Sequence, residues 1–222
     1  MDSVLVAASV AAESGQKILE LGCGSGVALC CLLYRVSGVE VYGVEMDKKA
    51  ADLCRRNLDL NSFDAKIFNS NIAKTISEMK SVSFDHVFMN PPYFKKNSVK
   101  KSPSPSFRHA RVESVPLSAW FSVANKRCKP NGKITIIQRV ERLPDIIDCL
   151  NSDFGKVTVL PISSFKDASP KRVIVQATKT SKAAFKLLAP KIVHRRDRLS
   201  GRVVYEDEFK EILRCGHPLP LN

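Results

Sequence analysis

Residues 17–26 read KILELGCGSG, and this stretch decides the fold. Its first five residues form a short apolar run typical of a buried strand. The segment that follows, Val27 to Val36, is apolar nearly all round, as a helix packed on a sheet is. Gly22, Gly24 and Gly26 permit positive φ and carry no Cβ, so backbone N–H groups and a helix N-terminus can approach a ligand there. The spacing GxGxG differs from the pyrophosphate fingerprint GxGxxG, and a single glycine loop also suits a tight turn that binds nothing.

Strand-like and helical patterns alternate along the rest of the chain. Further strands are expected at Val39–Val44, Ala65–Phe68, Phe84–Met89 and Lys133–Gln138, a turn at Pro130–Gly132, and helices at Asp47–Leu60, Pro116–Cys128, Glu141–Leu150 and Tyr205–Arg214. The last two strand-like runs, Lys156–Ile162 and Arg172–Thr178, are joined by a segment too short for a helical crossover, so we expect them to pair antiparallel. The sequence therefore predicts an α/β fold with a doubly wound, seven-stranded, mostly parallel sheet and an antiparallel C-terminal hairpin.

The composition indicates one domain over residues 1–222. With 222 residues, 44% of them hydrophobic, the chain is long enough for one substantial core. It contains no apolar run of transmembrane length and no signal-peptide pattern, so we expect a cytoplasmic protein that does not enter a membrane. The 7 cysteines form no CxxC pair, which favours reduced thiols over a metal site or a disulfide framework.

The basic excess lies entirely in the second part of the chain. Residues 1–93 carry a net charge of −2 and residues 94–222 a net charge of +15. Such asymmetry is typical of a protein that binds a polyanion, although simple solubility also accounts for it. Residues 94–113 show no strand or helix pattern and have no acid before Glu113, so we interpret them as a basic substrate loop. Its candidate nucleic-acid contacts are Lys95, Lys96, Lys100, Lys101, Arg108 and Arg111.

Asn90, Pro91, Pro92 and Tyr93 directly follow the predicted strand Phe84–Met89. The two prolines fix their own φ and remove two backbone donors, so the carbonyls around them cannot join a ladder and point outward. The tetrapeptide thus offers an amide side chain, exposed carbonyl acceptors and an aromatic ring to a flat NH2-bearing substrate. The alternative is that Pro-Pro merely ends a strand.

Glu45 lies 19 residues beyond Gly26, at the end of the second predicted strand. A carboxylate in that place accepts hydrogen bonds from both hydroxyls of a ribose. The glycine loop, this acid and the tetrapeptide together form a much stronger signal than any of them alone.

Four motifs follow one another along the chain: ELGCGSG at 20–26, GVEMD at 43–47, NSNI at 69–72 and NPPY at 90–93. In these motifs and their order the chain resembles the class I S-adenosylmethionine-dependent methyltransferases, and among them the branch that methylates amino groups. The resemblance implies a Rossmann-like fold. Later segments resemble the bacterial tRNA (adenine-37)-N6-methyltransferase group, which modifies the purine 3′ of a valine tRNA anticodon: ARVE at 110–113, RVERLP at 139–144, VLPI at 159–162 and KRVIV at 171–175.

The resemblance implies S-adenosylmethionine as the cofactor and tRNA as the partner, with no metal. It places the glycine loop around the methionine part of the cofactor, Glu45 at its ribose and Met46 on its adenine. Asn71 stands where the family usually has Asp, and with Ile72 it would read the adenine; Asn keeps a carbonyl acceptor but loses the charge. The implied cofactor-binding residues are Glu20, Gly22, Cys23, Gly24, Gly26, Glu45, Met46, Asn71, Ile72 and Asn90.

Asn90, Pro91, Pro92 and Tyr93 are the implied catalytic residues. An aryl NH2 group has its lone pair delocalised into the ring, and acceptors that bind its hydrogens free that pair for attack. Asn90 Oδ1 and the Pro91 carbonyl would accept those hydrogens, and Tyr93 would stack on the base. The same tetrapeptide serves enzymes that methylate a release-factor glutamine amide, and close variants serve rRNA guanine 2-amino groups, so these remain alternatives, as does a non-catalytic RNA-binding module.

The start of the chain departs from the pattern of these relatives. Residues 1–6 (MDSVLV) resemble the DAVLL of a family helix that normally has about one more supersecondary unit before it. We therefore expect an N-terminal element of the family to be missing.

Overall fold

A computed structural model describes residues 1–74, 79–93, 115–150, 153–197 and 200–221. The strands are β1 (Lys17–Leu21), β2 (Glu40–Glu45), β3 (Lys66–Asn69), β4 (Phe84–Met89), β5 (Cys128–Arg139), β6 (Phe154–Ser163), β7 (Arg172–Lys179), β8 (Lys186–Leu187), β9 (Lys191–Ile192), β10 (His194–Arg196) and β11 (Val203–Tyr205). The helices are α1 (Asp2–Ala8), α2 (Val27–Arg35), α3 (Lys48–Leu60), α5 (Leu117–Arg127), α6 (Leu143–Leu150) and α7 (Asp207–Cys215), with a 3₁₀ turn at Val140–Arg142.

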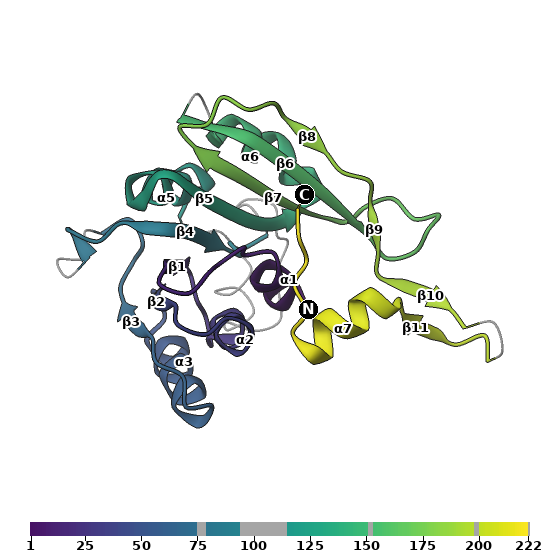
Figure 1. Cartoon of the computed structure of the whole chain (residues 1–222), viewed down its shortest axis with the longest axis horizontal. Helices are drawn as coiled ribbons and strands as arrows, with labels where there is room; N and C mark the ends of the chain where they lie inside the picture. Colours follow the sequence, from purple (N-terminus) through teal and green to yellow (C-terminus); the bar gives the residue numbers. More distant parts are fainter. Residues whose placement is uncertain (75–78, 94–114, 151–152, 198–199, 222) are drawn as a thin grey trace, which may run out of the picture.

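The main sheet has the strand order β3-β2-β1-β4-β5-β7-β6-β8 within the described residues (Figure 1). Strands β1 to β5 pair parallel, and β7 runs antiparallel to both β5 and β6. The predicted α/β class and the reversed C-terminal strand are confirmed. The two-residue strands β8 and β9 also pair with β6, which brings this sheet to nine strands rather than seven, and β10 and β11 form a separate antiparallel hairpin.

Both faces of the sheet are covered, which is why its strands read as continuous apolar runs. On β1, Leu19 and Leu21 face α5 and α6, while Ile18 belongs to the core beneath α1, α2 and α7 (Figure 1). Phe88 on β4 shares the second core with Ile18, so Glu20 on β1 and Asn90 just after β4 fall on this same face by alternation.

The predicted turn at Pro130–Gly132 instead lies inside β5. The register between β4 and β5 shifts between Phe84 and His86, and Asn131 has φ of 62°. The three residues therefore form a bulge in a continuing strand. Proline, asparagine and glycine mark bulges as well as turns, so their local signal alone does not separate the two.

Helix α1 lies between the sheet and α2 and carries four buried residues, Leu5 to Ala8. Arg35 at the end of α2 donates from Nη2 to the carbonyl oxygens of Ala7 (2.8 Å) and Val10 (2.7 Å). These bonds satisfy backbone acceptors where α1 ends. They fix the helix so that its first residues point toward the segment after β4.

Among the described residues, no helix is both long enough and apolar enough to cross a membrane.

Candidate active site

The segments predicted to form the site leave the sheet at one edge. Leu21, the last residue of β1, is the register partner of Val44 on β2 and of Met89 on β4, and all three strands are parallel. The glycine loop and the tetrapeptide, more than sixty residues apart in sequence, therefore start side by side. The carboxyl edge of a parallel sheet is where α/β proteins bind their ligands.

The three glycines of the loop have different surroundings. Gly22, Gly24 and Gly26 have φ of 69°, 53° and 82°, all in the left-handed region. A Cβ at Gly22 would lie 2.6 Å from the Trp120 ring, and one at Gly26 would lie 2.6 Å from Cys54 Sγ, whereas one at Gly24 would meet nothing within 4 Å. The outer glycines allow the loop to pack on α5 and α3, and Gly24 is the point that a ligand can approach.

Backbone hydrogen bonds hold this loop against β2. The amides of Gly22 and Cys23 both donate to the Val44 carbonyl, at 2.8 and 3.1 Å. Cys23 is buried, and its hydrogen bond with Cys54 together with burial raises the pKa of its thiol. Because these amides already have protein acceptors, they are not available to a ligand in this conformation, and Cys23 is held as a neutral thiol.

Glu45 is fixed by two backbone donors. Its Oε2 accepts from the Gly24 amide and its Oε1 from the Asp47 amide, both at 2.8 Å. Each carboxylate oxygen has a further lone pair, so Glu45 can still accept from the two hydroxyls of a ribose. Met46 follows it and is 47% exposed, which leaves its side chain open to contact with a flat ring.

Glu20 is a buried carboxyl whose Oε2 atom has no hydrogen-bond partner among the described residues. Burial first, and then the charges of Cys54 and Glu45, raise the pKa of Glu20 well above its ordinary value. A buried carboxyl beside a second one is costly to ionise, and a cation bound nearby lowers that cost. The pair Glu20 and Glu45 thus favours a positively charged ligand.

Asn71 follows β3 at the same edge of the sheet. Its Oδ1 accepts from the Ala73 amide at 2.8 Å, so the side chain shapes the turn as an aspartate would. Ile72 is buried beside a cavity of about 180 Å³ that Leu21, Val44 and Met79 also line. This cavity adjoins the ends of β1 and β2, and Ile72, which lines it, is one of the residues that the resemblance implies for the cofactor adenine.

The tetrapeptide is bound to the start of α1. Asn90 Nδ2 donates to Ser3 Oγ at 3.4 Å, and the Tyr93 hydroxyl lies 3.0 Å from Asn90 Oδ1 and in a short hydrogen bond with an Asp2 oxygen. The hydroxyl carries one proton, so it cannot donate to Asp2 and Asn90 at once. Asn90 Oδ1 therefore keeps acceptor capacity.

Tyr93 is further held by Arg172 from β7. The guanidinium lies 4.7 Å from the centre of the Tyr93 ring, and its Nε donates to Asp2 Oδ2 at 2.9 Å. Burial, followed by the hydrogen bond with Asp2, raises the pKa of the Tyr93 hydroxyl above its ordinary value. The phenol stays neutral, and the arginine occupies one face of its ring.

Gln138 at the end of β5 supports the two prolines. It is fully buried, and its Nε2 lies 3.3 Å from both the Pro91 and the Pro92 carbonyl oxygens, while its Oε1 accepts from the Arg139 amide at 2.9 Å. The Pro-Pro segment lies beyond the end of β4, so its carbonyls have no ladder partner and need a donor from elsewhere. Gln138 supplies it and sets the direction of the peptide.

Sequence reasoning did not find Asp2, Ser3, Gln138 or Arg172 as parts of this site. Gln138 and Arg172 lie on strands that pattern analysis identified, and a polar residue at the end of an apolar strand was the only available signal. The predicted contacts Lys95, Lys96, Lys100, Lys101, Arg108 and Arg111, and the whole loop 94–113, lie outside the described residues. Within the described ranges, no group of three or more His, Cys, Asp or Glu is placed to hold a metal ion.

The family model of the methyltransferase small domain matches residues 2–166. The chain therefore belongs to the methyltransferase small domain family. Its fold is that of the Rossmann-like class I methyltransferases, for which S-adenosylmethionine is the implied cofactor.

Individual relatives agree with this assignment at low identity. A predicted methyltransferase of Methanocaldococcus jannaschii is 36% identical over 84 residues, which are 37% of this chain and 32% of that protein. The tRNA1(Val) (adenine(37)-N6)-methyltransferase of Shewanella sediminis is 25% identical over 174 residues, 74% of this chain and 70% of that protein. The chain thus spans about a third of the first relative.

A crystal structure of a predicted O-methyltransferase from Agrobacterium tumefaciens has the same fold. It superposes with a TM-score of 0.80 and 23% identity, over 100% of both chains.

S-adenosylmethionine carries a sulfonium and an ammonium group, and the residues present fit such a cation. The buried Glu20 oxygen without a partner can ionise when a cation lies beside it, Glu45 adds a second carboxyl group nearby, and Gly24 leaves space where a Cβ would stand.

We predict that alanine at Gly22 destabilises the protein more than alanine at Gly24. Both substitutions place an alanine in the left-handed region, which lowers the free energy of unfolding by about 1 kcal/mol. Only Gly22→Ala also places a methyl group against the Trp120 ring, and this overlap lowers it by roughly 1–3 kcal/mol more. Urea denaturation measures the two losses. In a double-mutant cycle, Trp120→Phe should recover part of the loss in the Gly22→Ala background; equal losses at the two glycines would contradict the packing described.

We predict that Glu20→Gln stabilises the protein without ligand, and increasingly so as pH rises. In the unfolded chain the Glu20 carboxyl releases its proton as the pH rises through its ordinary pKa of 4.5, whereas in the folded protein it keeps that proton to higher pH. The free energy of unfolding of the wild type therefore falls with rising pH until Glu20 also ionises in the folded state. Glutamine does not titrate. Urea denaturation between about pH 5 and about pH 8 measures the difference, with Glu13→Gln, at an exposed acid, as the control; a constant difference would contradict the prediction.

Proposed function

We propose that this chain methylates a planar amino group with S-adenosylmethionine, and that its target is the 6-amino group of an adenine in a tRNA anticodon loop. The observation that carries the proposal is the position of Asn90. The β1–β4 register puts Asn90 beside the glycine loop, with its Oδ1 able to accept and its neighbours held by Gln138 and Tyr93.

The cofactor-binding roles follow from the acids and the open glycine. Glu20 would balance positive charge, Glu45 would accept from the ribose, and the space at Gly24 would admit the methionine part. Met46 and Ile72, with the cavity beside Asn71, would contact the adenine. When bound, the cofactor supplies a methyl group on a sulfonium, which is the electrophile.

The tetrapeptide would hold the amino group in line. Asn90 Oδ1 and the Pro91 carbonyl each have a lone pair beyond their contacts within the protein, and each would accept one N–H of the substrate. Both hydrogens are then oriented away from the attacking lone pair, so positioning and electrostatics supply most of the acceleration. The base would stack on the face of Tyr93 opposite Arg172.

The choice of tRNA rests on charge and on relatives. Residues 94–222 carry the whole basic excess, which suits a polyanion. The Shewanella sediminis relative is named for the adenine at position 37 of a valine tRNA. A base in a folded anticodon loop must leave its stack, at a cost of roughly a few kcal/mol, and the basic residues 94–113 would bind the displaced strand.

We predict that labelled methyl groups from S-adenosylmethionine enter tRNA, and that nucleoside analysis finds them as N6-methyladenosine. Parallel reactions with rRNA and purified release factor test the alternatives. Label in protein alone, or in guanine of rRNA, would overturn the proposed substrate while leaving the enzyme class intact. Calorimetric titration that shows no cofactor binding at high micromolar concentration would instead favour a non-catalytic RNA-binding module.

We predict that Asn90→Ala lowers the rate of methyl transfer by at least about 100-fold, because it removes an acceptor aimed at the reacting nitrogen. Cofactor affinity, measured by calorimetry, should change little. Asn61→Ala, an exposed asparagine at the end of α3, is the matched control and should keep normal turnover. Near-normal transfer by Asn90→Ala would show that the tetrapeptide is not the catalytic element.

A further inference from the structure

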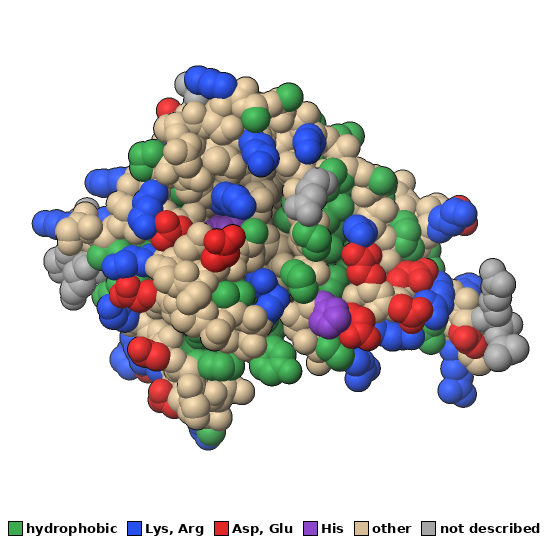
Figure 2. Space-filling view, viewed as in Figure 1, with side chains coloured by type: hydrophobic (Ala, Val, Ile, Leu, Met, Phe, Trp, Pro, Cys, Tyr) green, Lys and Arg blue, Asp and Glu red, His purple; other side chains and the backbone are tan. Residues whose placement is uncertain are grey.

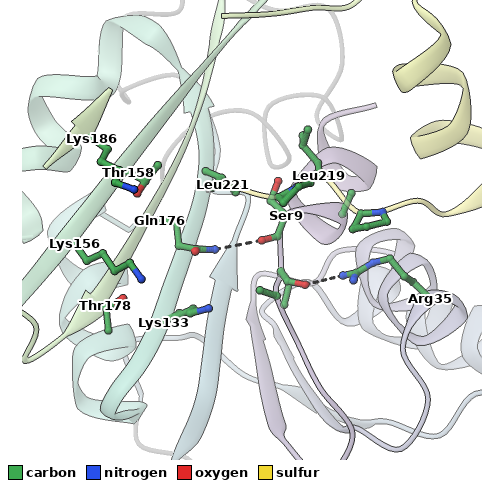
Figure 3. Close-up of a pocket in the computed structure, with 15 residues that line it drawn as sticks. Ser9, Arg35, Lys133, Lys156, Thr158, Gln176, Thr178, Lys186, Leu219 and Leu221 are labelled. Carbon is green, nitrogen blue, oxygen red and sulfur yellow. Dashed lines mark hydrogen bonds between the residues drawn. The ribbon is translucent and has the colours of Figure 1, made fainter. Parts of the chain in front are cut away.

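A second hollow, of about 320 Å³, lies between the end of α1 and the strands β5, β7 and β6 (Figure 3). Lys133 on β5 and Thr178 on β7 are register partners in its wall, and the backbone around Leu219 closes one side through a 2.8 Å bond to the Ala8 carbonyl. The hollow is distinct from the candidate active site. Lys133, in the wall of the hollow, and Arg139 are six residues apart on β5, which is about 20 Å at 3.3 Å per residue. Arg139 is the strand register partner of Arg172, and the Arg172 guanidinium lies over the Tyr93 ring of the candidate active site.

The walls of this hollow are basic. Lys133, Lys156 and Lys186 point into it from the sheet side, and Arg35 points toward them from α2 (Figure 3). No carboxylate lines it among the described residues. Two carboxylates line the adjoining hollow: Asp85, which forms an ion pair with Lys129 at 2.7 Å, and the exposed Glu13.

These three lysines differ from the cations near α7. Within the described ranges none of them forms an ion pair, whereas Lys191 and Arg195 near α7 pair with Glu208 and Glu206 at 2.6 and 3.0 Å. In the space-filling view, acidic side chains gather around α7, while Lys and Arg are frequent over the part where β5 to β8 lie (Figure 2). The positive charge of the hollow is therefore not balanced by the protein that lines it.

The backbone at Lys156 is held in an unusual conformation that turns its side chain into the hollow. Its φ is 48°, in the left-handed region that a long side chain rarely adopts. The register of β6 with β7 shifts here, between Gly155 and Thr158, and the Lys156 amide donates to the Ala183 carbonyl at 2.8 Å. Bulges commonly redirect a side chain beside a functional site, and such a conformation persists only where its surroundings impose it.

Arg35 and the hydroxyl groups add donors. Only Nη2 of Arg35 is used by the carbonyls of α1, so its Nε and Nη1 hydrogens are not committed to those bonds. Thr158 and Thr178 line the hollow as well. Burial first, and then the charges of Lys133 and Arg35, lower the pKa of the buried His86 to about 3, so the two cations lie close enough to act on this side chain.

We infer that this hollow is a binding site for a phosphate-bearing anion, separate from the methyl-transfer site. Convergent ammonium and guanidinium groups with hydroxyl donors match the charge and the several acceptor oxygens of a phosphate. The phosphate could come from the backbone of a bound RNA or from a small phosphorylated molecule, since both present the same group.

The test is calorimetric titration of the full chain with inorganic pyrophosphate at low salt. Wild type should show saturable binding, and the double variant Lys133→Gln with Lys156→Gln should bind at least about tenfold more weakly, because two charges that contact the anion are lost. Lys80→Gln with Lys166→Gln removes the same charge at exposed lysines that do not line the hollow, and should change the affinity by less than about twofold.

A single variant, Lys156→Gly, separates binding from folding. Glycine accepts the positive φ without strain, so thermal denaturation should show a protein at least as stable as wild type that nevertheless binds pyrophosphate more weakly. Absence of saturable binding by wild type, or equal losses in the pocket and control variants, would overturn the inference.

Binding of tRNA by the same variants identifies the source of the phosphate. Weaker RNA binding by the pocket variant, with competition by pyrophosphate, assigns the site to the RNA backbone. Unchanged RNA binding with loss of pyrophosphate binding assigns it to a small phosphorylated molecule. These titrations use no cofactor and measure no methyl transfer, so their outcome does not depend on whether the protein has the proposed methyltransferase activity.

Discussion

The alignment of the β1, β2 and β4 ends is the constraint on which the rest of the site depends. Two amides of the glycine loop donate to the single carbonyl of Val44, and a third donates to the Glu45 side chain. The loop is thus part of the β2 end as much as of β1. Because Leu21 is also in register with Met89, the same bonds fix the loop relative to Asn90. A one-residue slip of β4 would turn Asn90 to the opposite face of the sheet.

Much of this arrangement could be predicted from the sequence because its signals are local. The boundaries of β1 and β4 agree with the sequence prediction, and Asp47 caps α3 by accepting from Ala50. Each of these features depends on a few neighbouring residues. The Pro130–Gly132 segment shows the limit of local signals, since its role as a bulge depends on how β4 pairs with β5.

The supports of the tetrapeptide could not be predicted, because each is a contact between distant segments. Asp2 reaches Tyr93 across 91 positions, and Arg172 reaches Asp2 across 170. No periodicity or spacing records such pairs. Gln138 was similarly hidden in an apolar strand, where a lone polar residue gives no indication of its partner. The residues that contact the candidate catalytic tetrapeptide were therefore missed, whereas the tetrapeptide itself stands out in the sequence.

Helix α1 connects the candidate active site with the basic hollow. Its first residues, Asp2 and Ser3, contact the tetrapeptide, and its last turn receives the Arg35 bonds beside the basic hollow. The Ser9 carbonyl also accepts from Gln176 Nε2 at 3.2 Å, which ties the end of α1 to β7. A helix of seven residues is about 10 Å long. The Arg35 contacts and the contacts to Tyr93 and Asn90 therefore lie at opposite ends of one short helix, which the hollow and the candidate active site share even though their side chains do not meet.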